Sequence, residues 1–326
     1  MEIVRGIHQL KVPIPNNPLG YVLPYLIEGE DGFTLLDCGW NTPEAWEALE
    51  GQLKELGVAW HNVKRLVLTH VHPDHYGLAG RVKEASGAEV IMHARERDFI
   101  HSRYEEPEVL LAEMASWLLM HGVPENEVGQ LKNASMPARQ FVTSTLPDRV
   151  VYGGETFVTG SFELEVIWTP GHSPGHICLY ERGQRLLMTG DHVLPTISPN
   201  VSLHPQQLGN PLADFIEGIR RLKALDVDTA LPAHEFTFEH LQRRLTELEQ
   251  HHQARLQEML NAIGEGELTA YQVAAHVQWV TGKFETFSLW MKRAALGETL
   301  AHLEYLHREG MLRRTHRNGV VYFART

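Results

Sequence analysis

The sequence predicts a layered fold in which strands and helices alternate, followed by a smaller C-terminal module. Short apolar runs typical of strands alternate with helix-like segments through most of residues 1–250. The length of 326 residues exceeds the usual size of one domain. The stretch Gly264-Glu265-Gly266 has the composition of a linker. We therefore expect a large domain over residues 1–250 and a small one over residues 265–326.

The first half of the large domain is expected to begin with short strands and turns over residues 2–37, as a hairpin that opens a sheet. Thr42-Pro43-Glu44 supplies an N-cap, a first-turn proline and a first-turn acid for a helix that runs to about Leu56. A strand over residues 63–68 follows. A helix over residues 75–86 then stops at a glycine, and a strand over 89–92 comes next.

Residues 94–145 interrupt this alternation with helix-like segments, which we interpret as an inserted helical subdomain. Strand patterning returns over residues 150–168. The remainder completes a second half of the same kind, with strands over 177–180 and 186–188, a helix over 212–225 and a strand over 229–232.

The C-terminal module is predicted from a long helix over residues 238–263, the linker, and a helix over 297–309 with leucines at helical spacing. Two strand-like runs then flank Asn318-Gly319, a pair that strongly favours a tight hairpin. Helices followed by a two-stranded ribbon are typical of a winged helix-turn-helix, and we expect a winged-helix-like domain here.

Composition narrows the class of protein. Hydrophobic residues make up 43% and charged residues 21%, as in ordinary globular chains, and the net charge of -12 disfavours attraction to nucleic acid or an anionic membrane. The N-terminus lacks a signal-peptide pattern and no stretch approaches ~18 uninterrupted apolar residues, so we expect a cytoplasmic protein without membrane contact. The two cysteines, Cys38 and Cys178, lie in strand-like runs and argue against a disulfide framework or a thiolate metal site.

The segment that indicates chemistry is Thr69-His70-Val71-His72-Pro73-Asp74-His75-Tyr76-Gly77, at a strand-to-helix junction. His70 and His72, two positions apart at a strand end, can converge on one metal ion. Asp74 and His75, at the start of the helix, can face a second ion beside it. At a typical residue usage of ~5%, four specified positions match by chance somewhere in a chain of 326 residues with a probability on the order of 10⁻³.

Other potential metal ligands follow strand-like runs in three further segments. These are His172 within Thr-Pro-Gly-His, Asp191 within Gly-Asp, and His234 within Leu-Pro-Ala-His. Functional residues of layered α/β folds gather in loops at one edge of the sheets, so distant strand ends can meet there. Solvated loop histidines would be the simpler interpretation for any one of these residues, but not for the whole group.

On these motifs the chain resembles the metallo-β-lactamase superfamily, whose signature His-x-His-x-Asp-His is matched in full at residues 70–75. The later family motifs match at His172, Asp191 and His234, and Asp37 in Leu-Leu-Asp-Cys-Gly fits the early aspartate motif. The resemblance covers roughly residues 1–250. It implies an α+β fold, a four-layer αββα sandwich, in which His70, His72 and His172 bind one metal, Asp74, His75 and His234 bind the other, and Asp191 bridges both.

Within the superfamily the sequence resembles the glyoxalase-II-like branch and proteins similar to β-lactamase-like endoribonuclease, which append a C-terminal winged helix. Residues 265–326 fit that appendage. His72 stands where the redox di-iron members have glutamate, so reduction of oxygen or nitric oxide is not expected.

The expected cofactors are two divalent metal ions. Nitrogen and carboxylate ligands favour Zn²⁺, with Fe²⁺ or Mn²⁺ as alternatives. Two ions about 3.5–4 Å apart can hold a water as hydroxide at neutral pH. Our hypothesis is that this hydroxide attacks an ester, thioester or lactone, while Asp74 orients it and accepts its proton.

Two more residues are candidates for catalysis because they adjoin ligands. Tyr76 and His192 are each able to donate a proton to a leaving group, although packing or solvent exposure is the preferred interpretation of both. Asp37 is expected either to orient a histidine or loop, or to cap a turn. The segment 114–120, rich in Met, Leu and Trp, is interpreted as local core or a subunit contact in a homodimer, with a substrate lid as the alternative.

Three functions remain open from the sequence. The first is a hydrolase of a small-molecule substrate; the second is a single-strand-specific endoribonuclease that holds RNA with its winged helix; the third is a non-catalytic, metal-sensing winged-helix regulator. Residues 255–326 contain nine Lys and Arg against seven Asp and Glu, with Arg313, Arg314 and Arg317 as the one basic cluster. A nucleic-acid module normally carries a denser basic stripe, so nucleic acid is not the favoured partner. Seven ligands exceed what structural metal binding requires, which disfavours the regulator.

Overall fold

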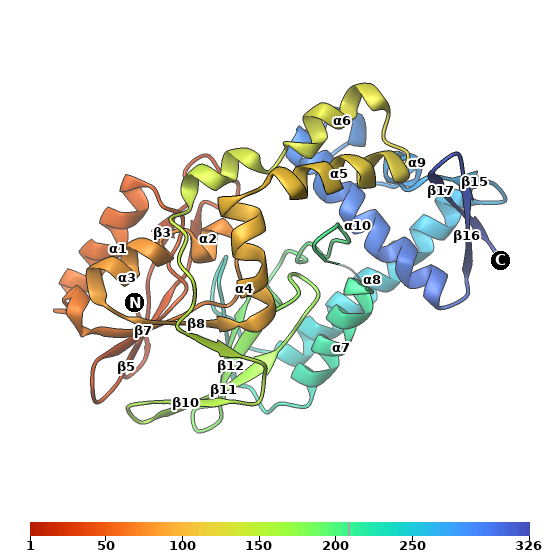
Figure 1. Ribbon diagram of the computed structural model, residues 1–326. Helices are drawn as coiled ribbons and strands as arrows, with labels where there is room; N and C mark the ends of the chain where they lie inside the picture. Colours follow the sequence, from red (N-terminus) through yellow and green to blue (C-terminus); the bar gives the residue numbers. More distant parts are fainter. Residues whose placement is uncertain (208) are drawn as a thin grey trace.

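Two β-sheets packed face to face form the centre of the molecule in the computed structural model, which describes residues 1–207 and 209–326 (Figure 1). The first sheet has the strand order β1 (Glu2–Val4), β2 (Ile7–Gln9), β5 (Tyr25–Glu28), β6 (Phe33–Leu36), β7 (Val63–Val67), β8 (Glu89–His93) and β9 (Arg149–Val151). The second has the order β10 (Thr156–Thr159), β11 (Phe162–Trp168), β12 (Ile177–Glu181), β13 (Leu186–Gly190) and β14 (Thr229–Pro232).

The packing follows from the alternation of side chains along each strand. From the first sheet, Ile27 and Leu36 point toward the second sheet, where Leu164 and Val166 meet them in one buried cluster. Leu35, next to Leu36 on β6, belongs to the cluster on the opposite face. Both faces of the first sheet are therefore covered, which agrees with the mostly apolar runs of β5, β6 and β8.

Helices cover the two outer faces. Helix α1 (Pro43–Glu55) and helix α3 (Ala79–Ser86) pack on the first sheet, while α7 (Pro211–Lys223) and the first half of α8 (Leu241–Ile263) pack on the second. The predicted capping of α1 is confirmed, because the side chain of Thr42 accepts a hydrogen bond from the amide of Ala45. The expected α+β sandwich is thus present, with a short hairpin of β3 (Val12–Pro13) and β4 (Tyr21–Val22) beside it.

The helix predicted over residues 75–86 is interrupted. A single turn, α2 (Pro73–Tyr76), precedes α3, and α3 ends as expected at Gly87, which has a φ of 71°. The amide of Leu78 donates to the carbonyl of Gly39 at 2.9 Å instead of continuing the helical pattern. The neighbouring Gly77 is in such close contact with Phe141 and Gly39 that a Cβ would lie 2.4 Å and 2.8 Å from their oxygens. Long-range contacts therefore split what local sequence favours as one helix.

The segment predicted as a helical insertion is helical in the structure. It contains α4 (Ala94–Ile100), a π-helical turn η2 (His101–Glu105), α5 (Glu108–Met120), α6 (Glu125–Lys132) and a 3₁₀ turn η3 (Met136–Phe141). A further 3₁₀ turn, η1 (Trp60–Asn62), precedes β7.

The C-terminal module contains α9 (Ala270–His276), a 3₁₀ turn η4 (Phe284–Thr286), α10 (Leu289–Arg308) and a three-stranded sheet with the order β15 (Glu267–Leu268), β17 (Val320–Arg325) and β16 (Leu312–Arg317). The predicted hairpin is confirmed: Asn318 and Gly319 both have positive φ, as a type I′ turn requires. Helix α10 begins at Leu289 rather than at residue 297, because Ser288 caps it. That this module is a winged helix stays a prediction.

The insertion and the C-terminal module share one apolar core. Met114 and Leu118 of α5 pack together with Met259 of α8, Leu300 of α10 and Phe323 of β17. Figure 1 shows α5 and α6 lying beside α9 and α10. Residues 264–266, predicted as a linker, form a tight turn after α8, with the amide of Gly266 donating to the carbonyl of Ile263.

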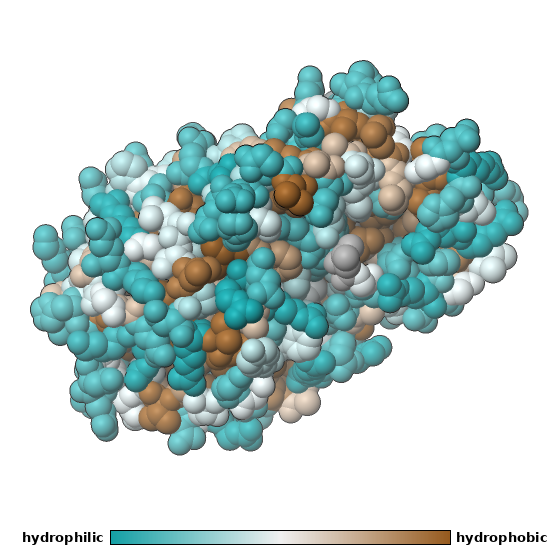
Figure 2. Space-filling view, viewed as in Figure 1, coloured by the Kyte–Doolittle hydropathy of each residue, from teal (hydrophilic) through white to brown (hydrophobic). Residues whose placement is uncertain are grey.

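The surface is mixed, and apolar side chains gather over α5 and α6 in the view of Figure 2. Leu119 and Met120 on α5 are among the exposed large apolar residues. No helix in the described ranges has both the length and the apolarity needed to cross a membrane. The cytoplasmic location and the homodimer stay predictions.

The shared core predicts that substitutions of two adjacent leucines of α5 differ in their effect on the free energy of unfolding. We expect Leu118→Ala, at a position with 0% exposure, to lower the free energy of unfolding by about 2–5 kcal/mol, because it leaves a cavity between α5 and the C-terminal helices. Leu119→Ala, at a position with 40% exposure, is the matched control and should cost less than about 0.5 kcal/mol. Urea unfolding measures both, and equal effects would contradict the shared core.

Candidate metal centre

The ends of four strands deliver the candidate ligands to one edge of the sandwich. His70 and His72 follow β7, Asp74 and His75 lie on α2 immediately after it, and the others follow β11, β13 and β14. The ligand atoms form three overlapping groups, each within 4.8 Å of one another: His70, His72 and His172; His70, His75 and Asp191; and Asp74, His75 and His234. The structure therefore brings all seven predicted residues together.

The first group consists of three imidazoles. His70 Nε2 lies 2.9 Å from His72 Nδ1, and His172 Nε2 lies 3.3 Å and 3.0 Å from these two nitrogens. Ligand nitrogens 2.0–2.1 Å from a tetrahedral zinc ion are about 3.3 Å apart, as the corners of a tetrahedron require. The spacing of these three nitrogens fits one ion held by all of them.

The third group, Asp74, His75 and His234, combines two imidazoles with a carboxylate. His234 Nε2 lies 3.3 Å from Asp74 Oδ2, and His75 Nε2 lies 3.8 Å from the same oxygen. The Asp191 carboxylate lies between the groups, 3.4 Å from both His75 Nε2 and His234 Nε2 and 3.6 Å from His172 Nε2. Its two oxygens can therefore reach both groups.

Unpartnered polar atoms show that the site fits metal ions. His75 Nε2, His234 Nε2 and Asp191 Oδ1 are buried and have no hydrogen-bond partner among the described residues. Leaving such atoms unsatisfied is costly, and all three lie at the centre of the cluster. Nitrogen and carboxylate donors at these spacings suit zinc-class ions. The number and identity of the ions stay predictions.

Asp37 fixes one of these histidines. Its carboxylate accepts hydrogen bonds from the amide of Thr69 at 2.8 Å, from the Thr69 hydroxyl at 2.9 Å and from His75 Nδ1 at 2.8 Å. With Nδ1 donating, Nε2 of His75 is left to bind an ion. Asp37 has a φ of 60°, an uncommon backbone conformation that directs its side chain across the ends of β6 and β7. The geometry favours the orienting role over a simple turn cap.

Two candidate histidine ligands, His172 and His234, lie outside the motif at residues 70–75. Main-chain carbonyls orient both of them. His172 Nδ1 donates to the carbonyl of Asn200, and His234 Nδ1 donates to the carbonyl of Tyr21, both at 2.9 Å. The loop that carries Asn200 is in turn held by α10. The side-chain amide of Asn200 donates to Glu298 Oε2 at 3.2 Å, and the main-chain amide of Leu203 donates to the carbonyl of Gly297 at 2.9 Å. The C-terminal module therefore supports a candidate ligand.

Glu96 joins two loops of the site, and no sequence pattern predicts this role. It lies on α4, is fully buried, and accepts hydrogen bonds from the amides of Val71 at 2.8 Å and Gly175 at 2.6 Å. Burial raises the pKa of this carboxyl. A glutamate in a charged helical stretch is normally a surface residue, so only the tertiary structure reveals this role.

Tyr76 and His192 lie where packing accounts for them. The Tyr76 hydroxyl both donates to the carbonyl and accepts from the amide of Thr145, each at 2.7 Å. His192 is fully buried beneath α7 against Phe215 and Gly218, and burial lowers its pKa to about 3, so it is neutral at pH 7. These positions favour the packing interpretation, and of the three predicted catalytic residues only Asp74 belongs to the ligand cluster.

The histidines of the cluster fall into two halves whose pKa values are shifted in opposite directions. Burial, followed by the neighbouring imidazoles, lowers the pKa of His70 and of His72 well below the ordinary value, so both are neutral and offer lone pairs. Burial lowers the pKa of His75 as well, but the carboxylates of Asp191, Asp37 and Asp74 outweigh it and raise the pKa. Burial would raise the pKa of Asp74, yet His75 and His234 hold it at about 2.

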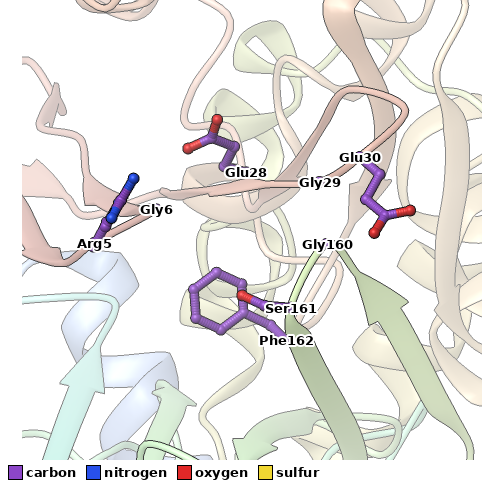
Figure 3. Close-up of a pocket in the computed structure, with 8 residues that line it drawn as sticks. All are labelled: Arg5, Gly6, Glu28, Gly29, Glu30, Gly160, Ser161 and Phe162. Carbon is purple, nitrogen blue, oxygen red and sulfur yellow. The ribbon is translucent and has the colours of Figure 1, made fainter.

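A separate pocket lies at the far edge of the sandwich (Figure 3). It is formed by the turns β1–β2, β5–β6 and β10–β11, which precede β6 and β11, whereas Asp37 and the candidate ligand His172 follow those strands. Its lining residues are Arg5, Gly6, Glu28, Gly29, Glu30, Gly160, Ser161 and Phe162. None of them belongs to the ligand cluster, so this pocket is not the candidate active site.

The sandwich and the His/Asp cluster at its edge define the class of metallo-hydrolases, and comparison with known proteins gives the family. Residues 17–234 match the sequence model of the metallo-beta-lactamase superfamily, so the chain belongs to that superfamily. The probable metallo-hydrolase YqjP of Bacillus subtilis is 27% identical over 96% of both chains.

Two other proteins extend the comparison. The crystal structure of the metallo-beta-lactamase family protein TTHA1429 from Thermus thermophilus superimposes with a TM-score of 0.83 at 35% identity and covers 100% of both chains. The bovine protein named acyl-coenzyme A thioesterase MBLAC2 is 27% identical over 66% of this chain and 73% of its own length.

The role of Asp37 can be tested through metal affinity. We expect Asp37→Ala to weaken binding of the ion at His75 by about 10- to 100-fold, because His75 loses the acceptor that orients its ring. Competition with a chromophoric chelator measures the change. Asp31→Ala removes a 63% exposed aspartate and serves as the control. Unchanged affinity in folded Asp37→Ala would contradict the orienting role.

The two halves should also differ in their response to pH. Raised pKa values keep His75 and His234 protonated to a higher pH than usual, so metal binding there must displace protons. We expect the ion in this half to be lost first as pH falls from about 8 to about 5, while the neutral imidazoles of His70 and His72 retain theirs. Metal content after dialysis at each pH measures this, with His72→Ala and His234→Ala identifying the halves; loss of both ions together would contradict it.

Proposed function

We propose that the chain is a dinuclear metal-dependent hydrolase that acts on an ester, thioester or lactone of a small molecule. The observation that carries the proposal is the arrangement of six ligand-type residues in two groups of three, with the carboxylate of a seventh, Asp191, between them. When bound, two such ions supply a Lewis acid for the substrate oxygen and an activated water as nucleophile. In this arrangement His70, His72 and His172 hold one ion, and Asp74, His75 and His234 the other.

Asp74 has a second task in the proposed reaction. Its Oδ2 faces His234, its side chain keeps 16% exposure, and its low pKa leaves it ionised at neutral pH. An ionised carboxylate at the rim of the site accepts a hydrogen bond from the attacking water and takes its proton at Oδ1. Asp191, which is more enclosed, has both oxygens directed at the histidines and serves as a ligand.

The chain's own thiols do not provide a competing nucleophile. Cys38 and Cys178 are both fully buried, and burial raises the pKa of Cys178 to about 12 and that of Cys38 well above its usual value. Both therefore remain uncharged thiols, and the thiolate is the reactive form. Activated water remains the nucleophile that this site supports.

Two observations support a small-molecule substrate. The bovine relative is named an acyl-coenzyme A thioesterase, which favours a thioester among the three bonds considered. In addition, two arginines of the C-terminal ribbon are engaged by acids: Arg314 with Glu304 at 3.0 Å, and Arg317 with Glu267. These ion pairs reduce the positive charge that an RNA-binding wing would need.

The proposal predicts metal content and turnover together. We expect the purified protein to contain close to two metal ions per chain, to hydrolyse a generic thioester or aryl ester, and to lose this activity on chelation. Asp191→Ala and His172→Ala should reduce metal content and rate in parallel, because each removes a ligand. Asp226→Ala, at a 77% exposed position, is the control. Full metal content and rate in the two ligand variants would refute the assignment, and activity on single-stranded RNA alone would refute the substrate class.

A further inference from the structure

The main chain between His70 and His72 is held on both sides by the helical insertion. Val71, the residue between these two candidate ligands, is fully buried. Its amide donates to Glu96 Oε2 at 2.8 Å, and its carbonyl accepts from the Tyr104 hydroxyl at 2.6 Å. Glu96 lies on α4 and Tyr104 in η2. Two side chains of the insertion therefore satisfy both main-chain polar groups of a buried residue at the metal centre.

Glu96 also reaches the loop that carries His172. Its Oε1 accepts from the amide of Gly175 at 2.6 Å, and Gly175 follows His172 by three residues. A Cβ at Gly175 would lie 2.8 Å from Glu96 Cγ, so the absence of a side chain there permits this close approach. One carboxylate thus joins the loop of His70 and His72 to the loop of His172.

Tyr104 is itself fixed in place by two further segments. Its carbonyl accepts a hydrogen bond from Arg139 Nη2 at 2.6 Å, and its ring stacks on that of Tyr76 with the ring centroids 5.7 Å apart. Arg139 belongs to η3 and Tyr76 to α2. Because a hydrogen bond is directional, a hydroxyl held in this way also restricts the position of the Val71 carbonyl that accepts from it.

We propose that Glu96 and Tyr104 are positioning residues for the three-imidazole group of His70, His72 and His172, so that the helical insertion sets the metal affinity of this half of the site. The three ring nitrogens lie between 2.9 Å and 3.3 Å apart, and neutral imidazoles whose lone pairs converge repel one another until a cation binds. Hydrogen bonds that hold the two loops together oppose this repulsion and lower the free-energy cost of bringing the donors together. This inference rests on the ligand assignment of the proposed function and is independent of the substrate.

The other half of the site provides an internal reference. The contacts that orient His75 and His234 come from residues other than the two positioning residues. A His234→Ala chain keeps the three-imidazole group complete, whereas a His72→Ala chain keeps the opposite group complete. The affinity of each half for Zn²⁺ can therefore be measured separately.

The first test removes one hydroxyl. Tyr104→Phe keeps the ring and its stacking but loses the hydrogen bond that the hydroxyl donates. We expect it to weaken Zn²⁺ binding about tenfold in the His234→Ala background, as for other residues that support a metal ligand, and to leave Zn²⁺ binding unchanged in the His72→Ala background. Competition with a chromophoric chelator measures each affinity. Tyr180→Phe is the matched control, because the hydroxyl of this 3% exposed residue donates to the carbonyl of Asp226 at 2.8 Å.

The second test weakens the link between the two loops. Glu96→Gln has nearly the same shape, but its amide group offers one acceptor oxygen where two main-chain amides donate, so one of the two hydrogen bonds is lost. We expect Zn²⁺ binding to weaken by about 10- to 100-fold in the His234→Ala background and to stay unchanged in the His72→Ala background. Circular dichroism and urea unfolding of the metal-free chains establish that each variant is folded. Glu163→Gln, at an exposed position of β11, is the control.

The outcomes separate this inference from the proposed function. Weakening confined to the His234→Ala background would support the positioning role even if no ester or thioester is hydrolysed, a result that would refute the hydrolase alone. Equal weakening in both backgrounds would indicate general destabilisation and overturn the positioning role. Hydrolysis and two bound ions in the wild-type protein, with Zn²⁺ affinities unchanged by Tyr104→Phe and Glu96→Gln, would also overturn it and leave the hydrolase standing.

Discussion

Three imidazole nitrogens within 3.3 Å of one another, with buried carboxylates beside them, are the constraint on which the site depends. Neutral imidazoles that turn lone pairs toward a common point repel one another, and a cation at that point converts the repulsion into ligation. The surrounding contacts hold this arrangement in place: Asp37 fixes His75, and main-chain carbonyls fix His172 and His234. The fold thus preorganises the donors before an ion arrives.

The sequence alone indicated much of this. The motif at residues 70–75 is local, so its strand-to-helix setting could be predicted, as could the capping by Thr42 and the hairpin at Asn318. Contacts between distant segments could not. The split of the predicted helix at Leu78, the burial of Glu96 and the hold of α10 on Asn200 each depend on a partner far away in sequence, for which no local pattern exists.

The C-terminal module contacts both the helical insertion and the loop that orients His172. Predicted as a separate domain, it shares a core with the insertion through Leu118 and Leu300, and it supports the loop that orients His172 through Glu298. Helix α8 runs from the sandwich into this core. Its Leu245 packs in the cluster on the outer face of the second sheet, and its Met259 packs in the core shared with the insertion. Site, insertion and C-terminal module are therefore mechanically continuous, and a domain boundary near residue 264 would divide contacts that act together.

That shared core also bears on how the chain is made. During synthesis α5 leaves the ribosome long before α10, yet Met114 and Leu118 find their apolar partners largely in segments translated afterwards. A nascent chain that ends before residue 289 would expose this helix face to water and to other nascent chains. The helical region can therefore close only when nearly the whole polypeptide has emerged.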